Sequence, residues 1–481
     1  MPQFAFSYPG KETRENPQMI ACDCLPNYEK CRNHRKTFML DKMFLFVLLL
    51  NLTGLFAFVA PQFGVGIATV SLVLFALNCL YITVNHKVAL RIFRKKHTFY
   101  WLIFLVFWPL LATIYAPAIN FREIVLQMYY FTLLLATAVY LLRKGFKSFH
   151  RIVAVAVAVT IFGLILSMFT EAFFQPVASI TDNALRYEGR AYGFFIQPNE
   201  AAINFVLLFI VWFSGLRKTK MSTVFLSLFG LLVLVILTGS RGGFVVAVAT
   251  IFLMFINKSV RAVKPFKILI SPKSIITFLL VFGCFLACIP LLLNFLAENL
   301  PRSADNFSVV NRIEAMSQMK LAEKDYRGKS TVAGRLEVFK RYSAMICERP
   351  ILGNGFGSIT ILQSKGVLGL SAHNQYLEIA FETGIFRLVF YLFLLIYIYM
   401  DKKRKRIEQF LHTNSYAQLL TVVAFAGMVS NMVLDSRVLY CALGCFIAML
   451  ISPQTITSDN VIGESTQNFR HIDNLRMQDE K

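Results

Sequence analysis

Long apolar runs separated by short polar segments dominate this chain. Twelve such runs can be drawn, at residues 43–60, 65–84, 99–115, 124–142, 152–169, 200–216, 224–237, 244–256, 275–296, 375–400, 419–434 and 438–451. A helix of roughly 20 apolar residues spans the hydrocarbon layer of a bilayer. Because the apolar positions are continuous rather than alternating, the pattern predicts transmembrane α-helices and not the strands of a barrel.

One polar stretch, residues 297–373, is far longer than the others. Inside it, residues 334–347 predict an amphipathic surface helix, because five of them fall close to one stripe: Leu336, Phe339, Tyr342, Ser343 and Ile346. The expected organisation is a tail (1–42), helices one to nine (43–296), a large loop (297–373), helices ten to twelve (374–452) and a second tail (453–481).

Composition and charge agree with a membrane protein. The chain has 481 residues, of which 56% are hydrophobic and only 16% charged, and its formal net charge is +22. Five short loops, after runs two, four, six, eight and ten, hold 22 lysines and arginines. The positive-inside rule therefore predicts that these loops and both termini are cytoplasmic. No soluble basic domain with interleaved aromatic residues is present in the sequence, so we expect no nucleic-acid partner.

This orientation places three polar segments on the opposite, outer face: residues 171–199, the turn at 239–243 and the large loop. Arg241 lies in the turn, at the mouth of two spans and among three glycines. Its guanidinium could contact an anion, because the glycines allow close approach to the backbone. The alternative is an arginine that snorkels to the membrane boundary.

Two further arginines are candidates for binding. Arg190 lies in an aromatic segment that could form a groove for sugars or lipid, and Pro198, Asn199 and Glu200 indicate a helix start. Arg335 falls in the first turn of the predicted surface helix, where a cation is unfavourable unless it serves an anion. The glycine-rich motif at 351–357 indicates a flexible turn, with a phosphate cradle as the alternative.

His373 begins the tenth run, and Asn374, Glu378 and Glu382 follow it at steps of four on one helix face. Charged groups at the end of a span are costly in lipid and predict a water-filled cavity. A histidine can accept a proton from a hydroxyl near neutral pH. A capping or interfacial histidine is one alternative, and a cation pathway of a transporter is another.

Three cysteines and a histidine near the N-terminus form a cluster of potential metal ligands. Cys22, Cys24, Cys31 and His34 lack the usual C-x2-4-C opening of a zinc site, so we expect no metal. Cys347 is alone on the large loop, and the cysteines in the apolar runs are expected to be small core residues.

Taken together, the ordered motifs resemble the O-antigen ligase and O-antigen polymerase superfamily. The resemblance rests on His373-Asn374, nine residues and then Gly384, on Gly334-Arg335, on the motif at 350–357, and on the segments at 238–243 and 189–199. It covers roughly residues 186–395. One departure is clear: the family pattern continues Gly-x-x-Gly, whereas Arg387 stands at the second glycine here.

The resemblance implies an all-α, polytopic, C-type glycosyltransferase-like fold in a bacterial inner membrane, with the active site facing the periplasm. It implies an undecaprenyl-diphosphate-linked glycan as donor and lipid A–core or a growing glycan as acceptor, without nucleotide sugar, metal or cofactor. It assigns Arg241 and Arg335 to the diphosphate and His373 to the acceptor hydroxyl, with inversion at the anomeric carbon.

Arg190, Asn374, Glu378 and Glu382 are further candidates for substrate contacts. Ligase is favoured, and polymerase and protein glycosyltransferase stay open. A transporter or flippase is the alternative of a different class.

Overall fold

A computed structural model describes residues 25–114, 120–169, 192–215, 221–261, 295, 331–368, 372–401, 415–430 and 433–451. The chain divides into two compact units, Met1–Met43 and Phe44–Lys481. In the first unit the described residues belong to helix α1 (Leu25–Thr53), which continues into the second. Throughout the described ranges the secondary structure is helical, without strands, as the apolar pattern predicted.

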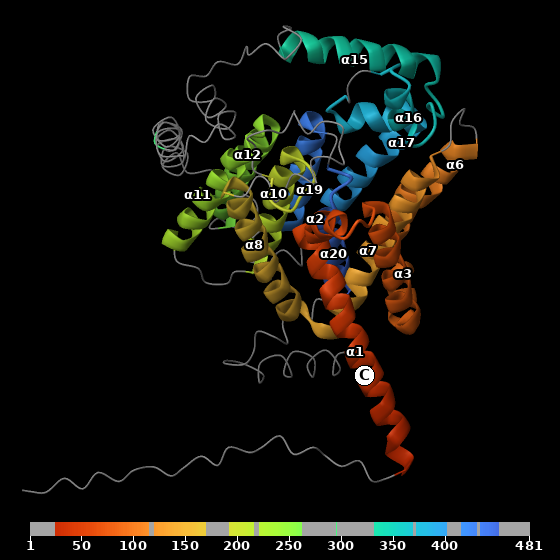
Figure 1. The fold of residues 1–481 in the computed structure, drawn as a ribbon, viewed down its shortest axis with the longest axis vertical. Helices are drawn as coiled ribbons and strands as arrows, with labels where there is room; N and C mark the ends of the chain where they lie inside the picture. The colour runs from red at the N-terminus through yellow and green to blue at the C-terminus, as the bar shows by residue number, and fades with distance from the viewer. Residues whose placement is uncertain are drawn as a thin grey trace, which may run out of the picture. The chain divides into compact units, whose positions relative to one another are not determined.

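The second unit contains the remaining helices (Figure 1). In chain order they are α2 (Leu55–Gln62), α3 (Ile67–Val84), α4 (His86–Phe93), α5 (Lys96–Leu102), η1 (Ile103–Phe107), α6 (Trp108–Ile114), α7 (Phe121–Lys144), α8 (Phe146–Phe169), α10 (Pro198–Gly215), α11 (Met221–Leu237), α12 (Arg241–Arg261), α15 (Thr331–Glu348), α16 (Ser358–Ser364), α17 (Gln375–Met400), α19 (Ser415–Val429) and α20 (Arg437–Ile451).

Four of the described segments are long and apolar enough to cross a membrane. They are Lys96–Ile114, Phe121–Lys144, Phe146–Ser167 and Gln375–Met400. A fifth is counted if Ala68–Val84 and His86–Phe93, which meet at 96°, form one bent span. The number of twelve spans stays a prediction, and the expected span at 275–296 lies almost wholly outside the described residues.

Two expectations from the sequence were wrong in detail. The first run is not one helix, because α1 ends at Thr53 and α2 begins at Leu55. Gly54 between them has a φ of +69°, and a side chain there would meet the Phe195 ring. The expected basic loop at 86–97 contains the short helix α4, whose Ala89 and Ile92 are buried against the helices beside it.

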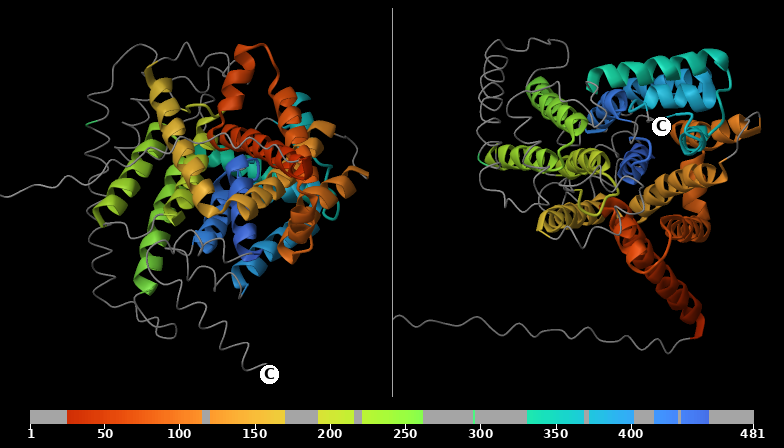
Figure 2. Two further views of the ribbon diagram at one scale, coloured as in Figure 1. Left: turned by 90° about the horizontal axis from the view of Figure 1, so that it is seen from below. Right: turned by 45° about the horizontal axis from the view of Figure 1, so that its top comes forward.

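Helices α19 and α20 lie in the middle of the second unit. In Figure 1 and in both views of Figure 2, the green α11 and α12 lie on one side of the blue α19 and α20, and the orange α3 and α6 on the other. Helix α20 packs along α7, where the rings of Tyr130 and Tyr440 stack 4.7 Å apart. Gly444 permits this approach, because a side chain there would collide with the backbone of Leu134.

Helix α7 has its two ends in different surroundings. Near its start, Gly357 lies so close that an added Cβ would be 2.6 Å from the Cβ of Asn120 and 2.9 Å from the Cγ of Glu123. Near its other end, a guanidinium nitrogen of Arg143 donates to Asn85 Oδ1 at 2.6 Å. About 20 residues of α-helix separate these contacts, which corresponds to roughly 30 Å.

Helix α17 repeats this arrangement. It starts beside His373, and Asp401 directly after its last residue pairs with His97 at 2.5 Å. We call the end with Glu123, Gly357 and His373 the motif end, and the end with Asn85 and His97 the basic end. The sequence motifs and the segment His86–His97 therefore lie about one membrane thickness apart.

Candidate functional site

The start of α17 fixes the position of His373. The Asn374 side chain caps the helix, because its Oδ1 accepts from the amides of Tyr376 at 3.0 Å and Leu377 at 3.1 Å. His373, immediately before the cap, has a φ of +48° and is the described non-glycine residue with positive φ. A left-handed backbone costs energy for a residue with a Cβ, and such strain is concentrated at functional sites.

The C-terminal end of α19 connects His373 with Arg241. Asn374 Nδ2 donates to the carbonyl oxygen of Met428 at 3.2 Å. One residue further along, the carbonyl oxygen of Val429 lies 3.3 Å from where a Cβ of Gly242 would be. The residues next to His373 and next to Arg241 thus contact consecutive residues of one helix end, so both candidates lie at the motif end.

The turn before α12 is tied to the start of α10. Ser240 Oγ accepts from the Gly243 amide at 3.0 Å and donates to Asn199 Oδ1 at 2.8 Å. Arg241 follows as the first residue of α12 and is half-buried. A cation in the first turn opposes the helix dipole, which favours a role in contacting an anion.

Glu200 and Arg437 form a partly separated ion pair that joins α10 to α20. A guanidinium nitrogen of Arg437 lies 3.9 Å from Glu200 Oε1, and both side chains are about nine-tenths buried. The amide of Ile196 donates to Glu200 Oε2 at 3.3 Å, and the Arg437 guanidinium lies 4.2 Å from the centre of the Phe56 ring. The expectation of a helix start at 198–200 is confirmed, and the carboxylate has a tertiary partner as well.

Asp435 lies in the short connection between α19 and α20, beside this pair. The pKa of its carboxyl is raised to about 7, mainly by desolvation and also by the charges of Glu123 and Glu200, with Arg437 acting in the opposite direction. The carbonyl oxygen of Asp435 accepts from the Tyr130 hydroxyl at 3.1 Å. A carboxyl group that titrates near neutral pH therefore lies in a short connection beside the Glu200–Arg437 pair.

The sequence analysis gave Asp435 and Arg437 no role beyond joining the last two apolar runs. Their signal was present: two charges stand between apolar runs with almost no loop to carry them into water. Gln375 was passed over as well, and its Oε1 accepts from the Leu434 amide at 3.3 Å, which anchors α17 to the same connection.

The glycine-rich motif packs against α17. The amide of Asn354 donates to the carbonyl oxygen of Phe381 at 2.8 Å, and the amide of Gly355 to that of Glu382 at 2.9 Å. The Ile385 amide returns a bond to the carbonyl oxygen of Pro350 at 2.8 Å. These bonds replace the helical bonds that are lost where α17 is kinked at Gly384.

The motif also holds a carboxylate. The backbone amides of Gly357 and Ile359 hydrogen-bond to Glu382, whose charged neighbours are Glu123 and Arg387. The sequence had left open that the glycine-rich motif binds a phosphate. In the structure, amides of this motif bind the side chain of Glu382 instead. The Arg387 guanidinium lies 4.5 Å from the ring centre of Phe104 and 5.2 Å from that of Phe356.

Helix α15 covers the segment before His373, and Figure 1 shows it at the same end as α16 and the start of α17. The Ala372 amide hydrogen-bonds to the Tyr342 hydroxyl oxygen, and the Tyr342 ring lies 5.1 Å from that of Phe381. Burial raises the pKa of Tyr342 above its usual value, and the carboxylates of Glu378 and Glu382 raise it further. The phenol is therefore neutral and positions the His373 backbone.

The amphipathic helix expected at 334–347 is confirmed as α15, with two corrections. It begins at Thr331, so Arg335 falls in its second turn and the argument from the first turn does not hold. Of the expected stripe, Tyr342 and Ile346 are buried, whereas Leu336 and Phe339 are 54% and 49% exposed. The buried face is instead completed by Val338 and Met345.

Several candidate binding residues lie wholly or partly outside the part of the chain that the structure describes. Arg190 lies outside the described residues, as does the side chain of Arg335. Glu378 is half-buried on α17. Cys22 and Cys24 lie outside the described residues, as do the side chains of Cys31 and His34. Within the described ranges no three His, Cys, Asp or Glu side chains are grouped to hold a metal ion.

Comparison with known protein families gives a match for the central part of the chain. Residues 225–392 match a family model described as O-antigen ligase. This segment is similar to the domain that defines the O-antigen ligase family. The match includes Arg241, Arg335, His373 and Gly384, and it confirms the resemblance to the O-antigen ligase and polymerase superfamily. No curated protein matches the chain.

The matched family implies a glycosyltransferase-like enzyme that handles lipid-linked glycans, and the apolar helices indicate a membrane protein. Glu200, Asp435 and Arg437 lie outside the matched segment. The structure nevertheless connects them to it, since Gln375 inside the domain is bonded to Leu434 outside it.

Proposed function

We propose that this protein is an O-antigen ligase. It transfers a glycan from undecaprenyl diphosphate to a hydroxyl of lipid A–core, at the periplasmic face of the bacterial inner membrane. The proposal rests on the O-antigen ligase domain and on one structural observation above all. The neighbours of His373 and of Arg241 contact Met428 and Val429, which supports a base and a permanent cation at the same end of the helices.

In the proposed reaction the acceptor oxygen attacks the anomeric carbon from the face opposite the diphosphate. A bond forms between this oxygen and the anomeric carbon, and the bond from that carbon to the diphosphate oxygen breaks. His373 takes the proton of the acceptor hydroxyl. The configuration at the anomeric carbon is inverted, because there is a single displacement.

The leaving diphosphate gains negative charge as the bond breaks, and arginine is suited to it because its guanidinium binds phosphate oxygens in a bidentate manner. Arg241 is proposed for this role from its place at the start of α12, and Arg335 from the family resemblance. The strained φ of His373 supports a fixed orientation for its imidazole, held by the Asn374 cap and the Tyr342 contact.

The role of Arg241 is tested by Arg241→Lys, which keeps the charge and removes the planar fork. Arg151→Lys is the matched control, because Arg151 is exposed at the start of α8 near the basic end. With purified lipid-linked glycan and acceptor, we expect a loss of at least tenfold in kcat/KM for Arg241→Lys, about 1.4 kcal/mol, and none for the control. Equal rates for both variants would remove bidentate diphosphate binding from the proposal.

The acceptor is tested by the envelope glycans of a deletion strain. A ligase predicts that all lipid A–core loses its glycan cap while lipid-linked glycan accumulates. Caps of a single repeat unit would instead identify a polymerase, which joins lipid-linked repeats before transfer. Loss of the caps with lipid-linked glycan retained on the cytoplasmic face, rather than accumulating on the periplasmic face, would point to a flippase.

A further inference from the structure

Helix α4 lies across the basic end rather than along a span. It meets α3 at 96°, and Asn85 forms the corner as the residue between the two helices. Asn85 Nδ2 donates to the carbonyl oxygen of Tyr81 at 2.8 Å, and its Oδ1 accepts from Arg143 at 2.6 Å. The corner is therefore fixed by side-chain bonds to α3 and α7, and the direction of α4 is set by the fold.

The surface of α4 has three distinct stripes. Ala89 and Ile92 are buried against the rest of the protein. Leu90 and Phe93, one step around the helix, are 54% and 37% exposed. Lys87, Arg91 and Arg94 follow at steps of four and three and form a cationic stripe.

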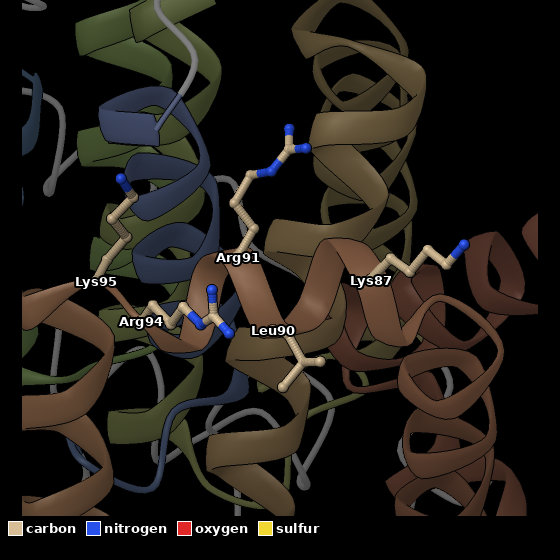
Figure 3. Close-up of a pocket in the computed structure, with 5 residues that line it drawn as sticks. All are labelled: Lys87, Leu90, Arg91, Arg94 and Lys95. Carbon is tan, nitrogen blue, oxygen red and sulfur yellow. The ribbon is translucent and has the colours of Figure 1, made fainter.

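The cationic stripe lines an open cavity of about 370 Å³. Its lining residues are Lys87, Leu90, Arg91, Arg94 and Lys95, shown in Figure 3. Four of the five carry a positive charge and none carries a negative one. The remaining lining residue, Leu90, provides exposed apolar surface beside the charges, which a purely aqueous anion does not use.

We propose that this cavity binds the headgroup of an anionic phospholipid, with the acyl chains of the lipid against Leu90 and Phe93. The charges are complementary to a phosphodiester, and an exposed apolar stripe beside a cationic one is the arrangement of helices that lie in the membrane interface. The lipid-linked donor is not the occupant, because α4 lies about 30 Å from the motif end along α7.

Native mass spectrometry of the full-length protein in detergent tests this proposal, with dioleoylphosphatidylglycerol and dioleoylphosphatidylcholine as probes. The wild type is expected to retain phosphatidylglycerol in preference to phosphatidylcholine. Each Lys or Arg near an anionic lipid contributes about fivefold to binding, so R91Q/R94Q is expected to weaken phosphatidylglycerol retention roughly tenfold to thirtyfold.

The control is K147Q/R151Q, which removes the same charge from the first two turns of α8 at the basic end. It is expected to change retention less than twofold. Equal weakening by both double variants would overturn the proposal, because general surface charge would then explain the binding. Displacement of the lipid by a molar excess of inorganic phosphate would also overturn it, since a site for a free anion would not need the apolar stripe.

The contact between Leu90 and the acyl chain can be tested separately from the charges. L90S leaves every charge in place and shortens the surface offered to the acyl chain. We expect weaker retention of phosphatidylglycerol with long acyl chains and unchanged retention of a short-chain analogue. The same loss for both lipids would contradict the placement of the acyl chain.

Discussion

The α-carbon of Gly384 in α17 lies directly against the carbonyl oxygen of Ile351, so that any side chain at this glycine would overlap it. Gly384 also has a φ of +83°, which residues with a Cβ rarely adopt. The two motifs of the sequence, His373-Asn374-x9-Gly384 and the glycine-rich 350–357, are therefore two halves of one packed unit. The spacing of nine residues places the kink opposite the glycine-rich motif.

Gly384→Ala is expected to destabilise the protein by at least about 3 kcal/mol, because both the backbone angle and the contact with Ile351 oppose a methyl group. Thermal unfolding in detergent measures the effect. Gly230→Ala is the matched control, since Gly230 lies within helix α11 and a Cβ there meets nothing within 4 Å. We expect no loss for the control, and a Gly384→Ala protein as stable as this control would contradict the packing described.

Arg387 stands where the family pattern has its second glycine, and its guanidinium is buried between Phe104 and Phe356 beside Glu382. Arg387→Met keeps much of the volume and removes the charge. The expected cost is about 3 kcal/mol, because Glu382 loses its cationic neighbour.

The double variant Arg387→Met/Glu382→Gln provides the decisive comparison in thermal unfolding. It should recover part of that loss, since no buried carboxylate is left without a cation. A double variant less stable than Arg387→Met alone would show that Glu382 does not depend on Arg387.

The Glu200–Arg437 pair is expected to couple α10 to α20 in stability and in activity. Glu200→Gln and Arg437→Met should each destabilise, and their effects should fall short of additive by about 1–3 kcal/mol. A double-mutant cycle from thermal unfolding measures this coupling. Additive effects within error would mean that the 3.9 Å separation reflects proximity without interaction.

Asp435 predicts a pH dependence with a defined sign. Its carboxyl pKa is raised to about 7, so the folded protein keeps this proton in a range where the unfolded chain has lost it. The folded state then binds more protons, and this carboxyl lowers stability as the pH rises from about 4 to about 7. Asp435→Asn removes the titration, so its stability relative to wild type should increase with pH over that range, by roughly 3 kcal/mol.

Unfolding temperatures of wild type and Asp435→Asn, measured across this pH range, check the sign. A difference between the two proteins that does not change with pH would mean that Asp435 is ionised throughout. Asn354→Ala at the motif end serves as a control for a polar loss without titration, and its difference from wild type should stay constant with pH.

The sequence predicts local structure well where hydropathy and capping decide it. The tenth run was expected at 375–400, and α17 covers Gln375–Met400 because Asn374 caps it and the apolar residues end before Asp401. The surface helix was found from its apolar spacing. Its exposed Leu336 and Phe339 were not foreseen, because the face that packs is chosen by Phe381 and Ala372 far along the chain.

In the candidate site too, the sequence predicted local features but not the contacts between distant segments. Arg241 and His373 were proposed from their position among glycines and at the end of a span, and their roles stay a prediction. Their connection through Met428 and Val429 was not predictable, since it depends on where α19 ends relative to α12 and α17. The carboxylate of Glu382 in the glycine-rich motif is also a contact between distant segments, and periodicity within one helix does not reveal it.

The central claim is that His373 accepts the proton of the acceptor hydroxyl at the motif end. The most direct measurement is the single-turnover rate of glycan transfer from purified lipid-linked glycan by His373→Ala, with His86→Ala, exposed at the basic end, as control. Loss of a general base predicts a fall of roughly 100-fold or more for His373→Ala, and an unchanged rate for His86→Ala. A His373→Ala rate within a few-fold of wild type, with a normally folded protein, would contradict the claim.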